Sequence, residues 1–238
     1  MAFNWFRKSR VVAPTLKSRG EETVVAARVD LSDMSPEVIP FLGQVAYFEL
    51  AVFESLSRAV TAAPNLSDKE GLTDAAGQVL AKHQGIVEEL RKLKVDPAEA
   101  MAPFAPAIDR FEQLTSGRDW YEMILGVYLT AGFLDDFFTR LVGGLPKATA
   151  ARVEVLLAPD KSADVIVAAL KSGMEQDPTL SSRLALWGRR LIGDTQLVAR
   201  SALQGSGNRK NDEERIEPVF TDLIAEHSRR MDGLGLTA

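Results

Sequence analysis

Residues 41–56 read FLGQVAYFELAVFESL, and their apolar residues recur at every third or fourth position. That spacing follows one face of an α-helix, whereas a half-buried β-strand would alternate at every second position. Ser35 and Pro36 precede the stretch and are typical of a helix start, with serine as N-cap and proline in the first turn. The sequence therefore predicts a long amphipathic helix over 36–63.

Three further segments share this period, at 67–94, 118–142 and 178–203. Ser67 and Glu70 form a capping-box pattern at the start of the second, and two glycines end the third. Shorter helices are expected after Asp96 and over 147–173, and a last helix should end near Met231. Because short turns join long helices, sequential helices should be antiparallel neighbours. We predict an all-α, up-and-down four-helix bundle with extra short helices and a C-terminal helix.

Composition limits the classes of function. The 238 residues contain no cysteine, which excludes thiolate metal sites, cysteine nucleophiles and disulfides. The net charge of -5 disfavours nucleic acid as the main partner. No segment resembles a secretory signal or a transmembrane helix, so we expect a cytoplasmic protein. Residues 1–20 contain basic residues and no acid, which indicates a partly disordered tail over 1–30. A helical domain over 31–238 should follow. The sequence contains one weak strand pattern, at 22–31.

Polar residues interrupt the apolar faces of the long helices. The apolar stripes of three helices are each interrupted once, by Glu49, His83 and Asp194. Asp135 lies beside the apolar stripe of the third long helix. Because these four residues fall at similar depths, we expect one polar layer across the bundle. The helical period predicts that three other acids face away from the core, namely Glu54, Glu122 and Asp136.

Two interpretations of this layer stay open. It is either a hydrogen-bonded layer that fixes helix register, or a metal site in which Glu49, His83 and Asp194 bind a single iron or another divalent ion. His227 lies on an apolar stripe of the last helix and is expected to pack helix ends rather than to bind a ligand.

Several segments resemble the bacterial ferritin-like proteins related to MiaE-like tRNA hydroxylases. They are FLGQVAYFELAVFESL at 41–56, LAKHQ at 80–84, TAGFLDDFF at 130–138, LALWGRRLIGDTQLVARSAL at 184–203 and EHSRRMDGLGL at 226–236. The resemblance implies a ferritin-like fold over most of the chain. It also implies that Asp194 and Glu54 match acidic positions of those relatives.

The resemblance further implies a depleted di-iron site. Ferritin-like di-iron centres use a Glu-x-x-His pair on each of two helices. Here Leu80 stands three residues before His83, Ile224 stands three before His227, and Ala131 lies near the position where the relatives carry an acid. We therefore expect no two-metal cluster and, as the first choice, no cofactor.

Three functions remain in competition. The first is a non-catalytic bundle with a binding or scaffolding role, which we favour. The second is a metal-dependent hydroxylase acting on modified tRNA, and the third is a small-ligand binder that uses the former active-site cavity. A homodimer is common for such bundles.

Overall fold

The computed structural model describes residue 31 and residues 34–159, 161–203 and 209–237. The tail expected over 1–30 and nearly all of the strand pattern at 22–31 lie outside these residues. Within the described ranges every regular element is helical, which confirms the all-α prediction. The helices are α1 Val38–Ala62, α2 Leu66–Lys92, α3 Pro97–Met101, α4 Ala105–Thr115, α5 Trp120–Leu141, α6 Lys147–Leu156, α7 Ser162–Gln176, α8 Thr179–Ser201 and α9 Arg209–Gly233, with a 3₁₀ turn at Val142–Gly144.

The ends of the long helices differ from the prediction by at most about two residues. Ser35 does not cap α1; its hydroxyl donates to the Leu141 carbonyl at 2.8 Å and so links the start of α1 to the end of α5. Asn65, rather than Ser67, caps α2 by accepting from the backbone N–H of Asp68 at 2.9 Å. Asp96 caps α3, as its position before Pro97 indicated.

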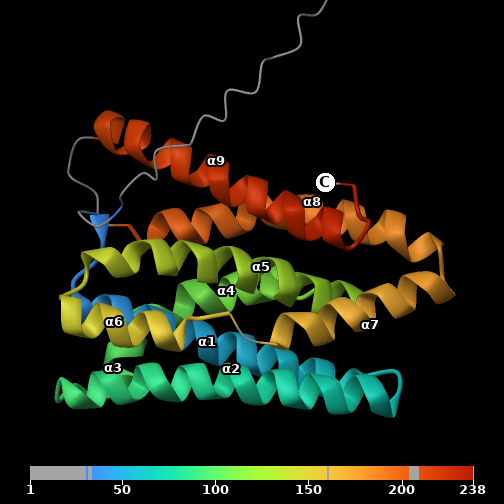
Figure 1. The fold of residues 1–238 in the computed structure, drawn as a ribbon, viewed down its shortest axis with the longest axis horizontal. Coiled ribbons are helices and arrows are strands. Elements are labelled where there is room, and N and C mark those ends of the chain that lie inside the picture. Colours follow the sequence, from blue (N-terminus) through green and yellow to red (C-terminus); the bar gives the residue numbers. More distant parts are fainter. Residues whose placement is uncertain (1–30, 32–33, 160, 204–208, 238) are drawn as a thin grey trace, which may run out of the picture.

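The long helices are stacked side by side (Figure 1). The antiparallel pair α1 and α2 lies at one side, α5 lies next to α1, and α8 and α9 lie beyond α5. Helix α7 packs against both α2 and α5, and α4 packs against both α1 and α8. The four predicted long helices therefore belong to one bundle, but α8 is separated from α2 by α1 and α5.

Aromatic side chains fill the contact between α1 and α5. Phe41 and Phe48 of α1 are fully buried against Phe138 of α5, with ring centroids 6.1 and 5.8 Å from that ring. At the same end, α3 crosses α1 so closely that a Cβ atom on Gly43 would lie 2.2 Å from the Ala100 carbonyl oxygen. Only a glycine therefore allows this backbone contact.

In the described ranges, α1 is the one helix long and apolar enough to cross a membrane by composition alone. However, 61% of its apolar window is buried inside the structure, as in the core helix of a bundle. Its apolar character is thus accounted for by packing against α2 and α5.

Candidate functional site

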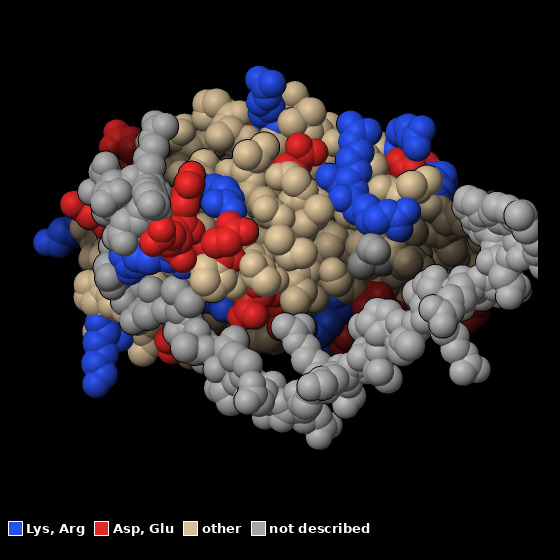
Figure 2. Space-filling view, turned by 90° about the horizontal axis from the view of Figure 1, so that it is seen from above, with Lys and Arg blue, Asp and Glu red and all other residues tan. Residues whose placement is uncertain are grey.

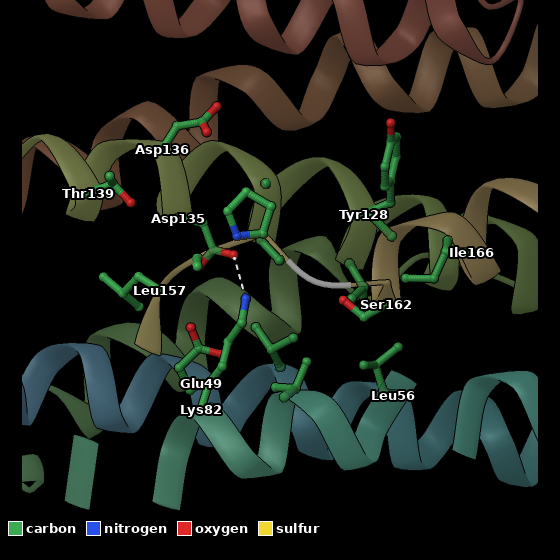
Figure 3. A pocket seen from close by; sticks show the side chains of 18 of the residues that line it. Glu49, Leu56, Lys82, Tyr128, Asp135, Asp136, Thr139, Leu157, Ser162 and Ile166 are labelled. Carbon is green, nitrogen blue, oxygen red and sulfur yellow. Dashed lines mark hydrogen bonds and ion pairs between the residues drawn. The ribbon is translucent and has the colours of Figure 1, made fainter. Parts of the chain in front are cut away.

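A cavity of about 410 Å³ lies between α1, α2, α5 and the junction of α6 with α7 (Figure 3). This volume falls within the range of about 300–1,000 Å³ that is usual for small-molecule sites. Most of its wall is apolar, and a group of charged side chains lines the rest. The apolar wall includes Val52, Leu56, Val79, Val127, Leu157 and Ile166. The charged side chains are Glu49, Lys82, Asp135, Asp136, Glu154 and Arg230.

Glu49 enters the cavity from α1. It lies on the buried face of the helix, between Val45 and Val52, and only 2% of it is exposed. The helical period predicted this position correctly. A buried carboxylate requires compensating charge or hydrogen bonds, and a lysine approaches it from the neighbouring helix.

That lysine is Lys82 of α2, whose side chain is 11% exposed. Its ammonium lies 3.5 Å from a carboxylate oxygen of Asp135 on α5. Figure 3 shows the Lys82 side chain extending past Glu49 towards Asp135. The Lys82 ammonium therefore partly neutralises the Asp135 carboxylate of the facing helix.

A second ion pair comes from the C-terminal helix. Arg230 of α9 donates through Nη2 to Asp136 at 2.6 Å, and both residues line the cavity. Its guanidinium crosses α5 at Gly132, where a Cβ atom would lie 2.5 Å from Arg230 Nε. The small residue therefore makes room for the arginine. Asp136, predicted to face outward, is half-buried in this pair.

Tyr128 and Ser162 add hydroxyl groups to the wall. Burial raises the pKa of Tyr128; the charge of Asp164 also raises it, and that of Arg230 opposes the shift. The phenol therefore remains neutral near pH 7. Ser162 belongs to the start of α7, which is held near α2 because Lys161 donates its backbone N–H to Gln78 at 3.0 Å.

Of the four residues expected to form a polar layer, the cavity brings together Glu49 and Asp135. His83 lies outside the cavity wall, and its Nδ1 donates to the Ala46 carbonyl at 2.8 Å. Neighbouring residues on a helix point about 100° apart. Lys82 therefore reaches the cavity, and the histidine beside it turns to the backbone of α1.

Asp194 also lies outside the cavity wall. It is half-buried on α8, whereas Thr195 beside it is 1% exposed. The physical reason is the position of α8, which contacts α4, α5, α7 and α9 and lies beyond α5 from the cavity. Glu54, the acid matched by family resemblance, is exposed on α1, as its helical position indicated.

The prediction that Glu122 faces outward is wrong, because its side chain is fully buried. Its carboxylate accepts from the Arg118 backbone N–H at 2.9 Å and from Arg183 of α8 at 3.0 Å. The Trp187 indole donates to the Glu122 carbonyl at 3.0 Å. This network fastens the start of α5 to α8, and none of its residues lines the cavity.

His227 is buried on α9, as its apolar stripe suggested, and its Nε2 donates to the Gly188 carbonyl of α8 at 3.1 Å. Burial lowers the pKa of His227 and the charge of Arg230 adds to this effect, whereas the Gly188 hydrogen bond opposes it. The ring is therefore a neutral packing element between two helices.

The charged side chains of the cavity do not resemble a metal centre. Within the described residues, no three His, Asp or Glu side chains come close enough together to hold a metal ion. The acids of the cavity are instead accompanied by an ammonium and a guanidinium.

Comparison with known proteins adds the family. A family model described as a ferritin-like domain of actinomycetes matches residues 32–204, a range that includes α1 to α8 and ends before α9. No curated protein matches the chain.

Proposed function

We propose that this chain, which belongs to the ferritin-like domain family of actinomycetes, is a non-catalytic protein that binds a small, largely apolar ligand inside its bundle. The observation that carries this proposal is the cavity of about 410 Å³ with its apolar wall. A cavity of this kind suits a molecule that buries most of its own surface.

The residues present do not fit the di-iron group that the fold implies. Such a centre needs about six carboxylate and imidazole ligands on facing helices. In this chain Leu80 and Ala131 stand where acids would be needed, His83 binds a backbone carbonyl, and Lys82 brings a positive charge towards Asp135. A fixed ammonium and a divalent cation repel each other at this distance.

The side chains that line the cavity do not support the hydroxylase alternative. They also give no support to the relationship with MiaE-like enzymes or to tRNA as a substrate. The single-metal alternative is also disfavoured, because Glu49 lines the cavity whereas His83 and Asp194 do not. A homodimer and a cytoplasmic location stay predictions.

The test is binding of Nile red, an uncharged apolar dye whose fluorescence rises in apolar surroundings. We expect the wild-type protein to bind it at a single saturable site. The variant Ala131→Trp should abolish binding because a large ring on α5 fills the cavity. The matched control is Ala81→Trp, on an exposed position of α2 outside the cavity wall, and it should bind as the wild type does. Equal binding by both variants would show that the dye does not bind in the cavity.

A further inference from the structure

One side of α8 faces away from the bundle and carries two large apolar side chains. Leu186 is 64% exposed and Leu197 is 67% exposed. Their separation is close to three full helical turns, so both point in the same direction. Arg190 and Gly193 lie between them on the same side and are also exposed. These four residues, which we call the α8 stripe, are spaced by four, three and four positions, as in helices that pack along each other.

Gly193 has no explanation within a single chain. A Cβ atom at this position would meet no described atom within 4 Å, so no close approach inside the fold requires a glycine. A glycine in the interior of a helix is less favourable than an alanine. The open space beside Gly193 is therefore available to a side chain from another molecule.

The α8 stripe is complementary to itself. In an antiparallel pair of identical helices related by a two-fold axis, each contact occurs twice. When Leu186 lies opposite Leu197 of a second copy, Arg190 lies opposite Gly193 of that copy. Leucine then meets leucine, and the long arginine meets the residue that has no side chain. An unrelated partner would not need this match between the stripe and its own reverse.

The same register brings opposite charges together. Asp194 is half-buried at the edge of the stripe, on the side to which Arg190 also belongs. In an antiparallel two-fold pair, one edge of a helix meets the same edge of the other, so Asp194 of each copy comes beside Arg190 of the other. The Arg190 guanidinium lies 5.7 Å from the centroid of the Trp187 ring, which directs it towards the N-terminus of α8. Asp194 of the second copy lies on that side of Arg190.

We propose that the α8 stripe binds the α8 stripe of a second copy, in an antiparallel dimer whose two-fold axis passes between Arg190 and Gly193. Helix α8 lies beyond α5 from the cavity (Figure 1), so the dimer leaves the cavity free. The contact uses one helix of each copy, and interfaces smaller than about 1,200 Å² are typically weak and transient. The dimer is therefore expected to be concentration-dependent.

The experiment is sedimentation velocity of the full chain over a range of concentrations. We expect monomer at about 1 µM and a substantial share of dimer at about 100 µM. Leu197→Glu should weaken the dimer at least about tenfold, because the two-fold axis doubles the loss of each apolar contact. The matched control is Leu66→Glu at the start of α2, where the leucine is 82% exposed. This control should dimerise as the wild type does.

Charge reversal tests the register. Arg190→Glu places two acids beside each other across the axis, and Asp194→Lys places two bases there, so each single variant should lower the dimer affinity. The double variant exchanges the two charges and should recover the affinity to within about threefold of the wild type. Circular dichroism at the monomeric concentration checks that each variant is folded.

Three outcomes would overturn the proposal. One is a wild type that stays monomeric at the highest concentration, and another is a dimer that Leu197→Glu leaves as strong as before. The third is a folded double variant that dimerises no better than the single variants. Nile red binding is measured separately on the same proteins, so these outcomes do not decide whether the cavity binds a ligand.

Discussion

Adjacent side chains on α2 decide which charge enters the cavity. Lys82 points to Asp135, and His83 points to the Ala46 carbonyl. With the positions exchanged, an imidazole would lie among carboxylates, as in a metal centre. With a lysine there, an amino group lies beside the Asp135 carboxylate instead of an imidazole.

His227 leads to a pH prediction. Its pKa is lowered in the folded protein, chiefly by burial, so the unfolded chain takes up a proton below about pH 6.5 before the folded protein does. The stability contributed by neutral His227 is therefore present above that pH and lost as the pH falls towards the lowered pKa.

We expect His227→Gln to lose less unfolding free energy than the wild type between about pH 7.5 and about pH 5. Glutamine keeps an N–H donor for the Gly188 carbonyl but does not titrate in this range. Urea unfolding at both pH values measures the difference, and the carboxylates common to both proteins cancel. An equal loss in the two proteins would contradict the prediction.

Helical periodicity predicted the burial of Glu49 and the exposure of Glu54, because both follow from the face of one helix. It did not predict the burial of Glu122, since that depends on Arg183 of another helix. The sequence did not indicate that Lys82 enters the cavity, because a lysine beside the apolar stripe of a helix usually extends into solvent. The signal that could have revealed the cavity is the pair Ala131 and Gly132, two small residues together on a core helix.

The helices could be predicted from the sequence, but which helices pack against one another could not. Four long periodic segments gave α1, α2, α5 and α8 to within about two residues at most ends. Nothing in the sequence indicated that α7 would lie between α2 and α5 and so move α8 away from the cavity. That choice depends on the fit of whole helix surfaces, which periodicity does not describe.

The contact of α1 with α3 gives a prediction for one glycine. Gly43→Ala should lower the unfolding free energy by about 1–3 kcal/mol, because the added methyl group collides with the Ala100 backbone and one helix must move. Denaturant unfolding measures the change.

The matched control is Gly193→Ala on α8, where a Cβ atom meets nothing within 4 Å. Alanine favours the helix there, so this variant should be roughly 0.5–1 kcal/mol more stable than the wild type. Destabilisation of similar size in both variants would point to a general effect of the substitution rather than to the α1–α3 contact.

At the scale of the whole molecule, charge is distributed unevenly over the surface. Figure 2 looks onto the face formed by α8 and α9 and shows acidic and basic groups mixed at its left, with mostly basic groups at its right. The net charge of -5 therefore conceals a surface with both signs.

Ligand binding should also stabilise the whole fold, because the unfolded chain has no cavity. At about 100 times its Kd, a ligand adds about 2.7 kcal/mol, which for a chain of this length raises Tm by about 5–10 °C. We expect Nile red to raise the Tm of the wild type, measured by circular dichroism. Ala131→Trp should show no rise, and a rise in this variant would place the bound dye elsewhere.

The ion pair of Arg230 with Asp136 also has a consequence for the order of synthesis. Helix α9 follows every other helix of the cavity wall in the chain, so it leaves the ribosome after them. Domains begin to fold during synthesis from the N-terminal side. In the nascent protein, Lys82 is available to Asp135 before Arg230 is available to Asp136. Synthesis therefore supplies the two cations of the cavity wall at different times, and the second comes with α9.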